Sequence, residues 1–457
     1  MTMPTKPKKP EAAVATPATG AVMPPAPPKK GPPPLPLVRG MRDILPAEWP
    51  HWQTLFREAE TLSDAYGYER IETPVLEETA LFVRGVGKQT DIVEKELYSF
   101  ETTGGEKVSL RPEGTAPVAR AYIHHGMLNK PQPVKLWYWS PMFRHDRPQS
   151  GRYREFWQYG LEVMGDADPV LDAQTAFMGW RLLKSVGVES VIHINSIGTP
   201  ESRANYKNAL TAYFRTKKHK LSEDDKKRLL KNPLRLLDSK DPGMDELKAE
   251  APQIVDWLDE SSKAHFMRVL EYLDEAGASY QLDPYLVRGL DYYTKTVFEI
   301  MPVSEDPEES KLALGGGGRY DGLHELVGGR PTPACGMALG LERVVARMKA
   351  NASAESAPSG QRDVFVAQLG EQGRKKAFAL FEELRLAGIK AGEALSKDAI
   401  KAQMEMANKM GAKWAVIIGQ KEVLDGTAII RDMDAGTQET VDVRKVAQEL
   451  KRKLGRD

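Results

Sequence analysis

Residues 143–165 read FRHDRPQSGRYREFWQYGLEVMG, and this stretch joins two strand-like halves through a polar loop. The segment before it, Lys135 to Arg144, is rich in aromatic residues, and residues 145–152 supply the turn-forming Pro, Ser and Gly. Residues 153–164 alternate between apolar and polar side chains. Together these features predict an antiparallel β-hairpin.

Alternation separates the two faces of the second strand, because successive side chains of a strand point to opposite sides. The odd positions from Tyr153 to Val163 are mostly apolar and predict the packed face. The even positions offer a ring, an amide, a gap and a carboxylate, at Phe156, Gln158, Gly160 and Glu162. A solvated surface is the plain interpretation of such a face. Four arginines nevertheless crowd the hairpin: Arg144, Arg147, Arg152 and Arg154. Guanidinium groups suit phosphate, and an exposed ring suits a stacked base.

This hairpin resembles motif 2 of the class II aminoacyl-tRNA synthetases, in the form found in the histidyl-tRNA synthetase family. The resemblance implies that Arg144 holds the α-phosphate of ATP and the amino-acid carboxylate. It implies that Phe156 stacks on adenine and that Arg152 also binds ATP. Gln158 and Glu162 would bind histidine, and both lie on the face that alternation separates from the packed one.

A second stretch, residues 109–117, reads SLRPEGTAP and runs from a short apolar strand into a proline-restricted turn. A charged turn followed by a helix N-cap is its plain interpretation. The family has the matching Arg-Pro-Glu-Gly-Thr peptide at the amino group of the substrate. A carboxylate and a hydroxyl accept hydrogen bonds from an ammonium group. The resemblance therefore assigns Glu113, Gly114 and Thr115 to histidine binding.

Residues 286–300, LVRGLDYYTKTVFEI, place a turn with Arg288 before a strand-like run. They resemble the peptide that distinguishes histidyl enzymes from other class II members. The resemblance implies that Arg288 lies at the α-phosphate, where a fixed cation stabilises developing charge. Tyr292 and Tyr293 would line the imidazole pocket. The glycine-rich residues 314–323, whose backbone can approach a ligand closely, would place Tyr320 behind histidine.

Residues 333–345, PACGMALGLERVV, lead from a strand of small residues into a helix and resemble motif 3. The resemblance implies that Arg343 holds the γ-phosphate of ATP and that Gly340 leaves room for the nucleotide. Cys335 is most simply a small packed residue, because a catalytic thiol needs a base partner. Residues 85–90, GVGKQT, do not have Walker spacing and predict a mobile loop near the site.

The N-terminal part predicts a helix over residues 47–66, with apolar positions at helical spacing, and an extended segment over 68–76. This pair resembles motif 1, which forms the dimer interface of the family and implies a homodimer. Residues 1–36 hold 12 of the 32 prolines, five lysines and one glutamate, and predict a disordered tail.

A chain of 457 residues is long enough for two or three domains. We expect a catalytic domain at 37–350, interrupted by a helical insertion at about 198–280, and a linker at 351–360. Residues 361–457 alternate short strands and helices and predict a small α/β domain with a mainly parallel sheet, in which Ser396 caps a helix. It resembles the anticodon-binding domain of class II synthetases. Residues 215–235 hold nine Lys or Arg against three acids, which predicts a solvated helical face or a clamp on the tRNA acceptor arm.

The composition excludes several classes of protein. Lys plus Arg and Asp plus Glu both total 64, so any RNA contact must come from local patches. No apolar run approaches the roughly 18 residues that a membrane span needs. The single cysteine excludes an intrachain disulfide and a multi-cysteine metal site, and it suits a reducing cytoplasm. No dedicated protein metal site is apparent, and the resemblance implies Mg²⁺ bound through the phosphates of ATP.

The resemblance implies an α+β fold, with an antiparallel sheet flanked by helices, and a two-step ligation of L-histidine to tRNA(His) through histidyl-adenylate. Arg147 and Gln149 would contact the extra guanosine at the tRNA 5′ end. The alternative is a non-catalytic regulatory subunit of histidine biosynthesis or a sensor of uncharged tRNA. Such paralogues tend to lose the ATP-binding arginines or the anticodon domain, and this chain keeps both. A stand-alone RNA-binding protein would not explain the second strand of the hairpin.

Overall fold

The computed structural model describes residues 35–88, 90–148, 151–237, 239, 241–306, 310–351 and 362–456. Most of the predicted tail and of the predicted linker lies outside these residues. In the described part of the chain, no helix combines the length and the apolar character needed to cross a membrane. The predicted domain boundaries stay predictions.

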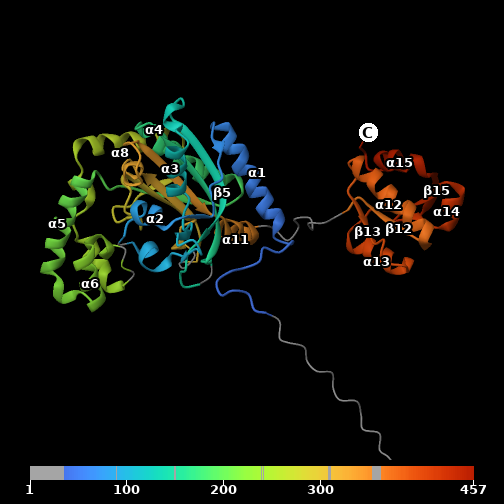
Figure 1. Cartoon of the computed structure of the whole chain (residues 1–457), viewed down its shortest axis with the longest axis horizontal. Coiled ribbons are helices and arrows are strands. Elements are labelled where there is room, and N and C mark those ends of the chain that lie inside the picture. Colours follow the sequence, from blue (N-terminus) through green and yellow to red (C-terminus); the bar gives the residue numbers. More distant parts are fainter. Residues whose placement is uncertain are drawn as a thin grey trace, which may run out of the picture. The chain divides into compact units, whose positions relative to one another are not determined.

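The described residues up to 351 are called the larger unit, and an eight-stranded sheet is their centre (Figure 1). The strand order of this sheet is β1-β5-β6-β11-β10-β9-β7-β8. Its inner pairs are antiparallel, and only the edge pairs β1–β5 and β7–β8 are parallel. The strands are β1 (Glu69–Arg70), β5 (Val134–Phe143), β6 (Glu155–Met164), β7 (Ser190–Ser196), β8 (Tyr280–Leu282), β9 (Thr294–Pro302), β10 (Gly315–Arg319) and β11 (Ala334–Gly340). The predicted antiparallel sheet and the β5–β6 hairpin are confirmed.

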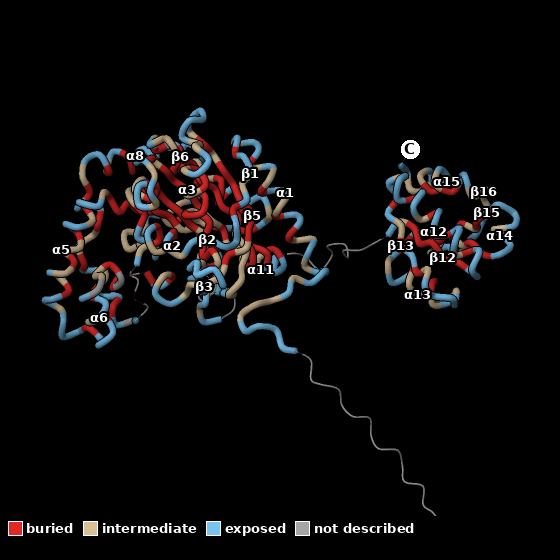
Figure 2. Tube along the Cα trace, viewed as in Figure 1, coloured by how far each residue is buried: buried red, intermediate tan, exposed pale blue. Residues whose placement is uncertain are grey.

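One face of this sheet carries the main apolar core, which appears as the buried centre of the larger unit (Figure 2). The odd side chains of β6, including Tyr159, Leu161 and Val163, pack into it as predicted. Four helices cover this face: α1 (Trp49–Ala65), α4 (Pro169–Ser185), α8 (Glu260–Glu275) and α11 (Leu341–Asn351). Their apolar residues recur every three or four positions, so each helix turns one side toward the sheet.

The other face of the sheet is covered less completely. Helix α3 (Thr115–His124) and a second apolar cluster pack on it, with α2 (Thr79–Gly85) beside α3. A three-stranded antiparallel sheet, with order β2-β4-β3, lies in the same part of the chain. Its strands are β2 (Leu76–Glu78), β3 (Ser99–Glu101) and β4 (Lys107–Leu110). The even side chains of β6 point to this face. Because the second cluster covers only part of the face, space remains above these side chains.

The segment predicted as a helical insertion is mostly helical. It contains α5 (Pro200–Thr216), α6 (Glu223–Lys231), α7 (Asp245–Ala249) and then α8. Helix α5 begins where Thr199 accepts a hydrogen bond from the Ser202 amide and Pro200 takes the first helical position. Its residues Leu210 and Phe214 are fully buried. Helix α8 packs against α4 in the main core, so it belongs with the large sheet.

The C-terminal unit has a five-stranded sheet with order β13-β12-β14-β15-β16. Its strands are β12 (Val364–Gln368), β13 (Ala391–Glu393), β14 (Trp414–Ile418), β15 (Thr427–Asp432) and β16 (Gln438–Asp442). Its helices are α12 (Gly370–Leu386), α13 (Ile400–Lys409), α14 (Gln420–Asp425) and α15 (Val446–Lys453). The predicted α/β class is confirmed.

Two details of the C-terminal prediction are wrong. The sheet is mixed, because β15 pairs antiparallel with both β14 and β16, so only two of its strand pairs are parallel. The edge strand β16 is mostly exposed and polar, and it therefore lacked the apolar signal of a buried strand. Ser396 caps no helix, since α13 begins at Ile400 without a side-chain cap.

Candidate active site

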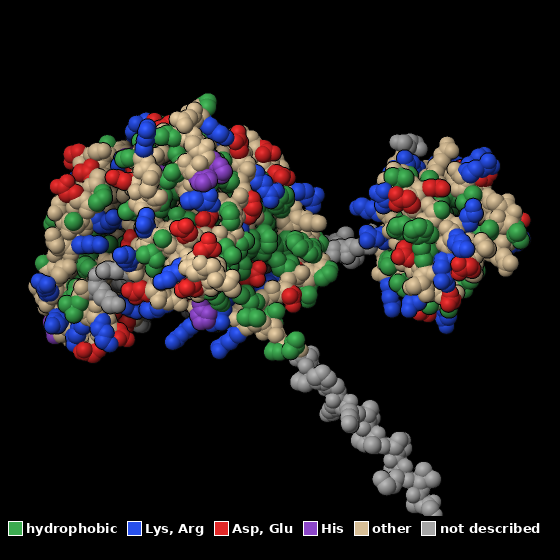
Figure 3. All heavy atoms as spheres, viewed as in Figure 1, with side chains coloured by type: hydrophobic (Ala, Val, Ile, Leu, Met, Phe, Trp, Pro, Cys, Tyr) green, Lys and Arg blue, Asp and Glu red, His purple; other side chains and the backbone are tan. Residues whose placement is uncertain are grey.

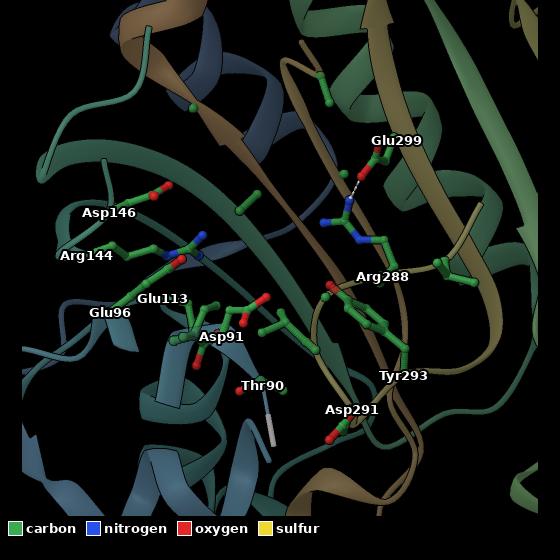
Figure 4. A pocket seen from close by; sticks show the side chains of 18 of the residues that line it. Thr90, Asp91, Glu96, Glu113, Arg144, Asp146, Arg288, Asp291, Tyr293 and Glu299 are labelled. Atoms are coloured by element: carbon green, nitrogen blue, oxygen red, sulfur yellow. Dashed lines mark hydrogen bonds and ion pairs between the residues drawn. The ribbon is translucent and has the colours of Figure 1, made fainter. Parts of the chain in front are cut away.

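A cavity of about 1340 Å³ lies over the even face of β6, where the second face of the sheet is left open. The hairpin, the start of α3, the turn before β9, strands β10 and β11, and helices α5 and α6 surround it. Figure 4 shows side chains from several of these elements around one space. The predicted site residues that line it are Glu113, Gly114, Thr115, Arg144, Arg152, Phe156, Gln158, Arg288, Tyr292, Tyr293 and Arg343.

The remaining predicted residues lie elsewhere. Glu162 is fully buried in the wall, where it contacts the lining residue Thr115, and Tyr320 lies behind Glu162. Arg147 is exposed on the hairpin loop and does not line the cavity. Gln149 lies outside the described residues. The structure thus brings the predicted histidine and ATP residues together, and it leaves Arg147 outside the cavity lining.

Glu113 is held by the start of α3. Its carboxylate accepts hydrogen bonds from the backbone amides of Thr115 (2.8 Å) and Ala116 (2.9 Å). It therefore serves the helix end in place of the N-cap position, which is Gly114 and has no side chain. Burial raises the pKa of Glu113, and these two amides and nearby Arg144 oppose that effect. The result is a buried carboxylate, fixed in direction, beside the cavity.

Glu162 is surrounded by hydroxyl groups. Its carboxylate accepts a hydrogen bond from the Thr115 hydroxyl (2.7 Å) and another from the hydroxyl of Tyr320. Burial raises its pKa to about 8, while the Tyr320 and Thr115 hydrogen bonds lower it in part. Burial penalises the charged form, and only polar neighbours or a bound ligand can offset that penalty.

Arg144 continues the chain after β5 and turns its guanidinium back toward the turn before α3. Its Nε donates to the Pro112 carbonyl (2.8 Å), and the group lies over the Phe156 ring, 5.3 Å from the ring centroid. Burial lowers the pKa of Arg144, against the opposing charges of Glu96 and Glu113. Figure 4 shows Arg144, Glu96 and Glu113 on the same side of the cavity.

Arg288 lies across the cavity from Arg144 and forms an ion pair with Glu299 of β9 (Figure 4). Its guanidinium also lies over the Tyr293 ring, 5.7 Å from the centroid. Burial alone would lower the pKa of Arg288, but the Glu299 carboxylate outweighs it and the pKa is raised. The cation is therefore permanent and has a fixed position.

Arg343 extends from the first turn of α11. Its guanidinium donates to the backbone carbonyls of Gly151 (2.9 Å) and Ala313. Burial lowers the pKa of Arg343, and so do the nearby charges of Arg152 and Arg144. These arginines repel one another, so an anion with several negative charges, such as a polyphosphate, would relieve the repulsion.

Several lining residues were missed by the sequence prediction. Glu342 lines the cavity and accepts hydrogen bonds from the Trp157 amide (2.9 and 3.1 Å), and burial raises its pKa to about 7. Glu96, Glu299 and Tyr138 line it too, as do Arg203 and Lys207 of α5. Tyr138 could have been found, because it faces Gly160 in the hairpin register. Glu299 and Glu342 lie within stretches that the sequence singled out, beside residues that were predicted, whereas Glu96, Arg203 and Lys207 lie in segments that carried no signal.

An antiparallel sheet that presents this hairpin, with arginines converging on one cavity, defines a class II aminoacyl-tRNA synthetase. The histidyl-tRNA synthetase family matches residues 40–344, and an anticodon-binding domain matches residues 363–453. The chain belongs to the histidyl-tRNA synthetase family.

Similar proteins agree with this assignment. Histidine–tRNA ligase of Dehalococcoides mccartyi is 44% identical over 91% of this chain and 99% of its own length. The enzyme of the same name from Pelotomaculum thermopropionicum is 45% identical over 91% of this chain and 97% of its own. The structure of apo S. aureus histidyl-tRNA synthetase matches with a TM-score of 0.75 at 35% identity, and it covers 91% of this chain and 100% of that one.

Proposed function

We infer that the chain ligates L-histidine to tRNA(His) in two steps that use ATP. An oxygen of the histidine carboxylate attacks the α-phosphorus of ATP and displaces pyrophosphate, which gives histidyl-adenylate. A hydroxyl of the terminal ribose of tRNA then attacks the histidyl carbonyl and displaces AMP. The observation that carries this inference is one cavity lined by a buried carboxylate, paired tyrosines and several arginines.

The carboxylates and tyrosines of the cavity would bind histidine. Glu113 and Thr115 would accept hydrogen bonds from its ammonium group, with the backbone of Gly114 allowing close approach. Glu113 is already oriented by two backbone amides, so it would lose little freedom on binding. Tyr292 and Tyr293, whose ring centroids are 4.7 Å apart, would line the imidazole pocket together with Gln158 and Glu162.

The arginines of the cavity would bind ATP. Arg144 would hold the α-phosphate and the histidine carboxylate, and Arg343 the γ-phosphate, with Arg152 beside it. Phe156 would stack on adenine. Arg288 would stabilise the negative charge that develops on the α-phosphate during transfer, because its position is set by Glu299 before the reaction begins. Catalysis would then rest mainly on positioning and charge stabilisation.

We propose that Mg²⁺ accompanies ATP, with most of its ligands supplied by phosphate oxygens and water, as is usual for this ion. The carboxylates that line the cavity beside Arg288 and Arg343 are Glu299 and Glu342. Both are oxygen ligands of the kind that Mg²⁺ takes, so they are the protein groups that would reach it. When bound, the ion would neutralise charge on the transferring phosphates.

We propose two further partners. Arg147 and Gln149 of the hairpin loop would contact the 5′ end of tRNA, and residues 361–457 would bind its anticodon, beyond a linker at 351–360. A second copy of the chain would cover α1, where a groove is lined by Trp49, Trp52, Gln53, Phe56, Arg57 and Trp139. Trp49 is 48% exposed, and Figure 3 shows hydrophobic side chains gathered near the start of α1. A cytoplasmic location stays a prediction from the sequence.

The test is amino-acid-dependent exchange between ATP and pyrophosphate, measured with each of the twenty amino acids. We expect exchange with histidine alone. A chain that binds histidine but supports no exchange would instead be a regulatory paralogue or a tRNA sensor. That alternative is not favoured, because Arg144, Arg288 and Arg343 all line the cavity and the C-terminal unit is present.

A further inference from the structure

Arg203 joins the helical insertion to the turn that carries the paired tyrosines. Its Nη1 donates a hydrogen bond to the backbone carbonyl of Tyr293 (2.8 Å), a residue 90 positions further along the chain. Arg203 lies in the first turn of α5, Tyr293 directly precedes β9, and both line the cavity. Burial lowers the pKa of Arg203, and the charge of Asp291 opposes that effect. The donor is thus a charged group, and hydrogen bonds from charged donors are stronger than neutral ones.

The α5 end of this hydrogen bond is anchored to the main core. Ser202, the residue before Arg203, is buried and donates to the carboxylate of Asp259 (2.9 Å). Asp259 caps the start of α8, and α8 packs against α4. Arg203 therefore projects from a part of the insertion that is held in place by the helices on the large sheet.

The tyrosine end is held through its backbone. The amide of Lys295, two residues after Tyr293, donates to the Gly198 carbonyl (2.8 Å), and the Lys295 carbonyl accepts from the Ile197 amide (2.7 Å). Lys295 has a φ of 50°, a left-handed conformation that residues with a side chain rarely adopt. Such a conformation persists only where the surrounding structure imposes it. The segment that leads into α5 therefore sets the path of the chain next to Tyr293.

Tyr293 in turn supports Arg288. The Arg288 guanidinium lies over the Tyr293 ring, 5.7 Å from the ring centroid, and it pairs with Glu299. Figure 4 shows Arg288 between Tyr293 and Glu299. The ring can hold the guanidinium only while the backbone of Tyr293 keeps its place, and Arg203 bonds that backbone at its carbonyl.

We propose that Arg203 is a positioning residue for the first step of the reaction. It holds the Tyr293 carbonyl, and the Tyr293 ring then keeps Arg288 in place for the α-phosphate. Arg203 itself contacts neither histidine nor ATP. The insertion thereby takes part in histidine activation before tRNA is bound. This proposal rests on the proposed function, since that function gives Arg288 its role in charge stabilisation.

The test is Arg203→Met, which keeps an unbranched side chain of high helix propensity and removes the donor. In ATP–pyrophosphate exchange without tRNA, kcat should fall about tenfold, as for one lost hydrogen bond to a charged group. The KM values for histidine and ATP should change by less than about threefold, because the lost support matters mainly when charge develops in the transition state. Arg203→Lys keeps a charged donor and should recover kcat to within about threefold of the wild type.

Arg215→Met is the matched control. Arg215 lies on the same helix, is exposed and does not line the cavity, so this variant loses the same charge and should keep full exchange. Urea unfolding of every variant sets the conditions, and exchange is measured well below each midpoint. If Arg203→Met does not fold, Arg203→Gln carries the same comparison, because its side chain stays polar and is too short to reach the Tyr293 carbonyl.

A double variant tests whether Arg203 acts through Arg288. Coupled residues give non-additive losses, so Arg203→Met should reduce exchange little further in an Arg288→Ala background. Losses that multiply would show that Arg203 acts elsewhere and would overturn the proposal.

Three other results would also overturn it. An unchanged kcat in Arg203→Met would show that the hydrogen bond to Tyr293 has no effect on the reaction. Equal losses in Arg203→Met and Arg215→Met would assign the effect to the charge of the insertion. A raised KM for histidine with an unchanged kcat would place Arg203 in binding alone. A wild type that supports exchange with another amino acid, or with none, would instead refute the proposed function.

Discussion

Two buried polar clusters lie in the larger unit, and they differ in how fully their groups are paired. In the first, Asp172 bonds Arg319 (2.6 Å) and His265 (2.7 Å), and Asp321 also pairs with Arg319 (3.0 Å). Burial would raise the pKa of Asp172, but His265 and Arg319 outweigh it and the pKa is lowered. In the second, around the cavity, burial prevails and the pKa values of Glu113 and Glu162 are raised.

The difference separates a structural role from a binding role. The cluster around Asp172 is complete, so its charges satisfy one another and hold β10 to α4 and α8. In the cavity cluster, neither Glu113 nor Glu162 forms an ion pair within the described part of the chain, and Arg144 offsets the burial of Glu113 only in part. A ligand with an ammonium group and an imidazole would supply what the second cluster lacks, and nothing is missing from the first.

The largest expected effect is on the complete cluster. Asp172→Ala leaves the Arg319 charge buried with only part of its pairing, and removing one partner of a buried pair costs about 3–5 kcal/mol. Urea unfolding should show this loss, while the KM values for histidine and ATP, measured well below the unfolding midpoint, should change little. A large rise in KM without loss of stability would contradict the structural role assigned to the Asp172 cluster.

Arg288→Ala tests whether a residue of the cavity cluster acts in the reaction and not in stability. We expect ATP–pyrophosphate exchange to fall by about 10²-fold or more, as for other lost charge stabilisation, with the unfolding midpoint nearly unchanged. Arg268→Ala, an exposed arginine of α8, is the control and should keep full exchange. If the two variants exchange equally well, Arg288 has no place in the reaction.

Glu162 should give the cavity cluster a pH signature. In the unfolded chain this carboxyl ionises near its ordinary pKa of 4.5, whereas in the folded chain it stays protonated until about pH 8. The folded state therefore binds more protons between these values, and stability falls as pH rises through this window. The slope is at most about 1.4 kcal/mol per pH unit. Unfolding at pH 6 and pH 7.5 should show this decline in the wild type and a weaker one in Glu162→Gln.

Gly160→Ala should have the smallest effect of the four. Its methyl group would displace the Tyr138 ring. We expect the KM for histidine to rise by about tenfold, because the displaced ring would change the shape of the cavity wall beside Glu113 and Gln158, with less change for ATP. Gly104→Ala, where the nearest atom would be 3.6 Å from the new Cβ, is the matched control. Equal KM values for histidine in the two variants would show that the ring position does not matter.

The sequence predicted what a single segment encodes. Alternation along β6 separated the packed face from the face that lines the cavity. The short polar loop predicted that the two strands of the hairpin pair antiparallel. Pairings between distant segments could not be predicted this way. Glu299 becomes a site residue only because β9 places it beside Arg288, and Glu342 because α11 meets β6. The mixed C-terminal sheet was missed because β16 has no buried side chain to mark it.

The bond between Glu342 and the Trp157 amide has a mechanical consequence. It joins the residue after Phe156 to the residue before Arg343, so the two proposed contacts at opposite ends of ATP belong to one rigid body. Such a body keeps the distance between Phe156 and Arg343 fixed. A nucleotide whose adenine and terminal phosphate are spaced as in ATP would contact Phe156 and Arg343 at once. A shorter nucleotide, such as ADP, would make only one of the two contacts.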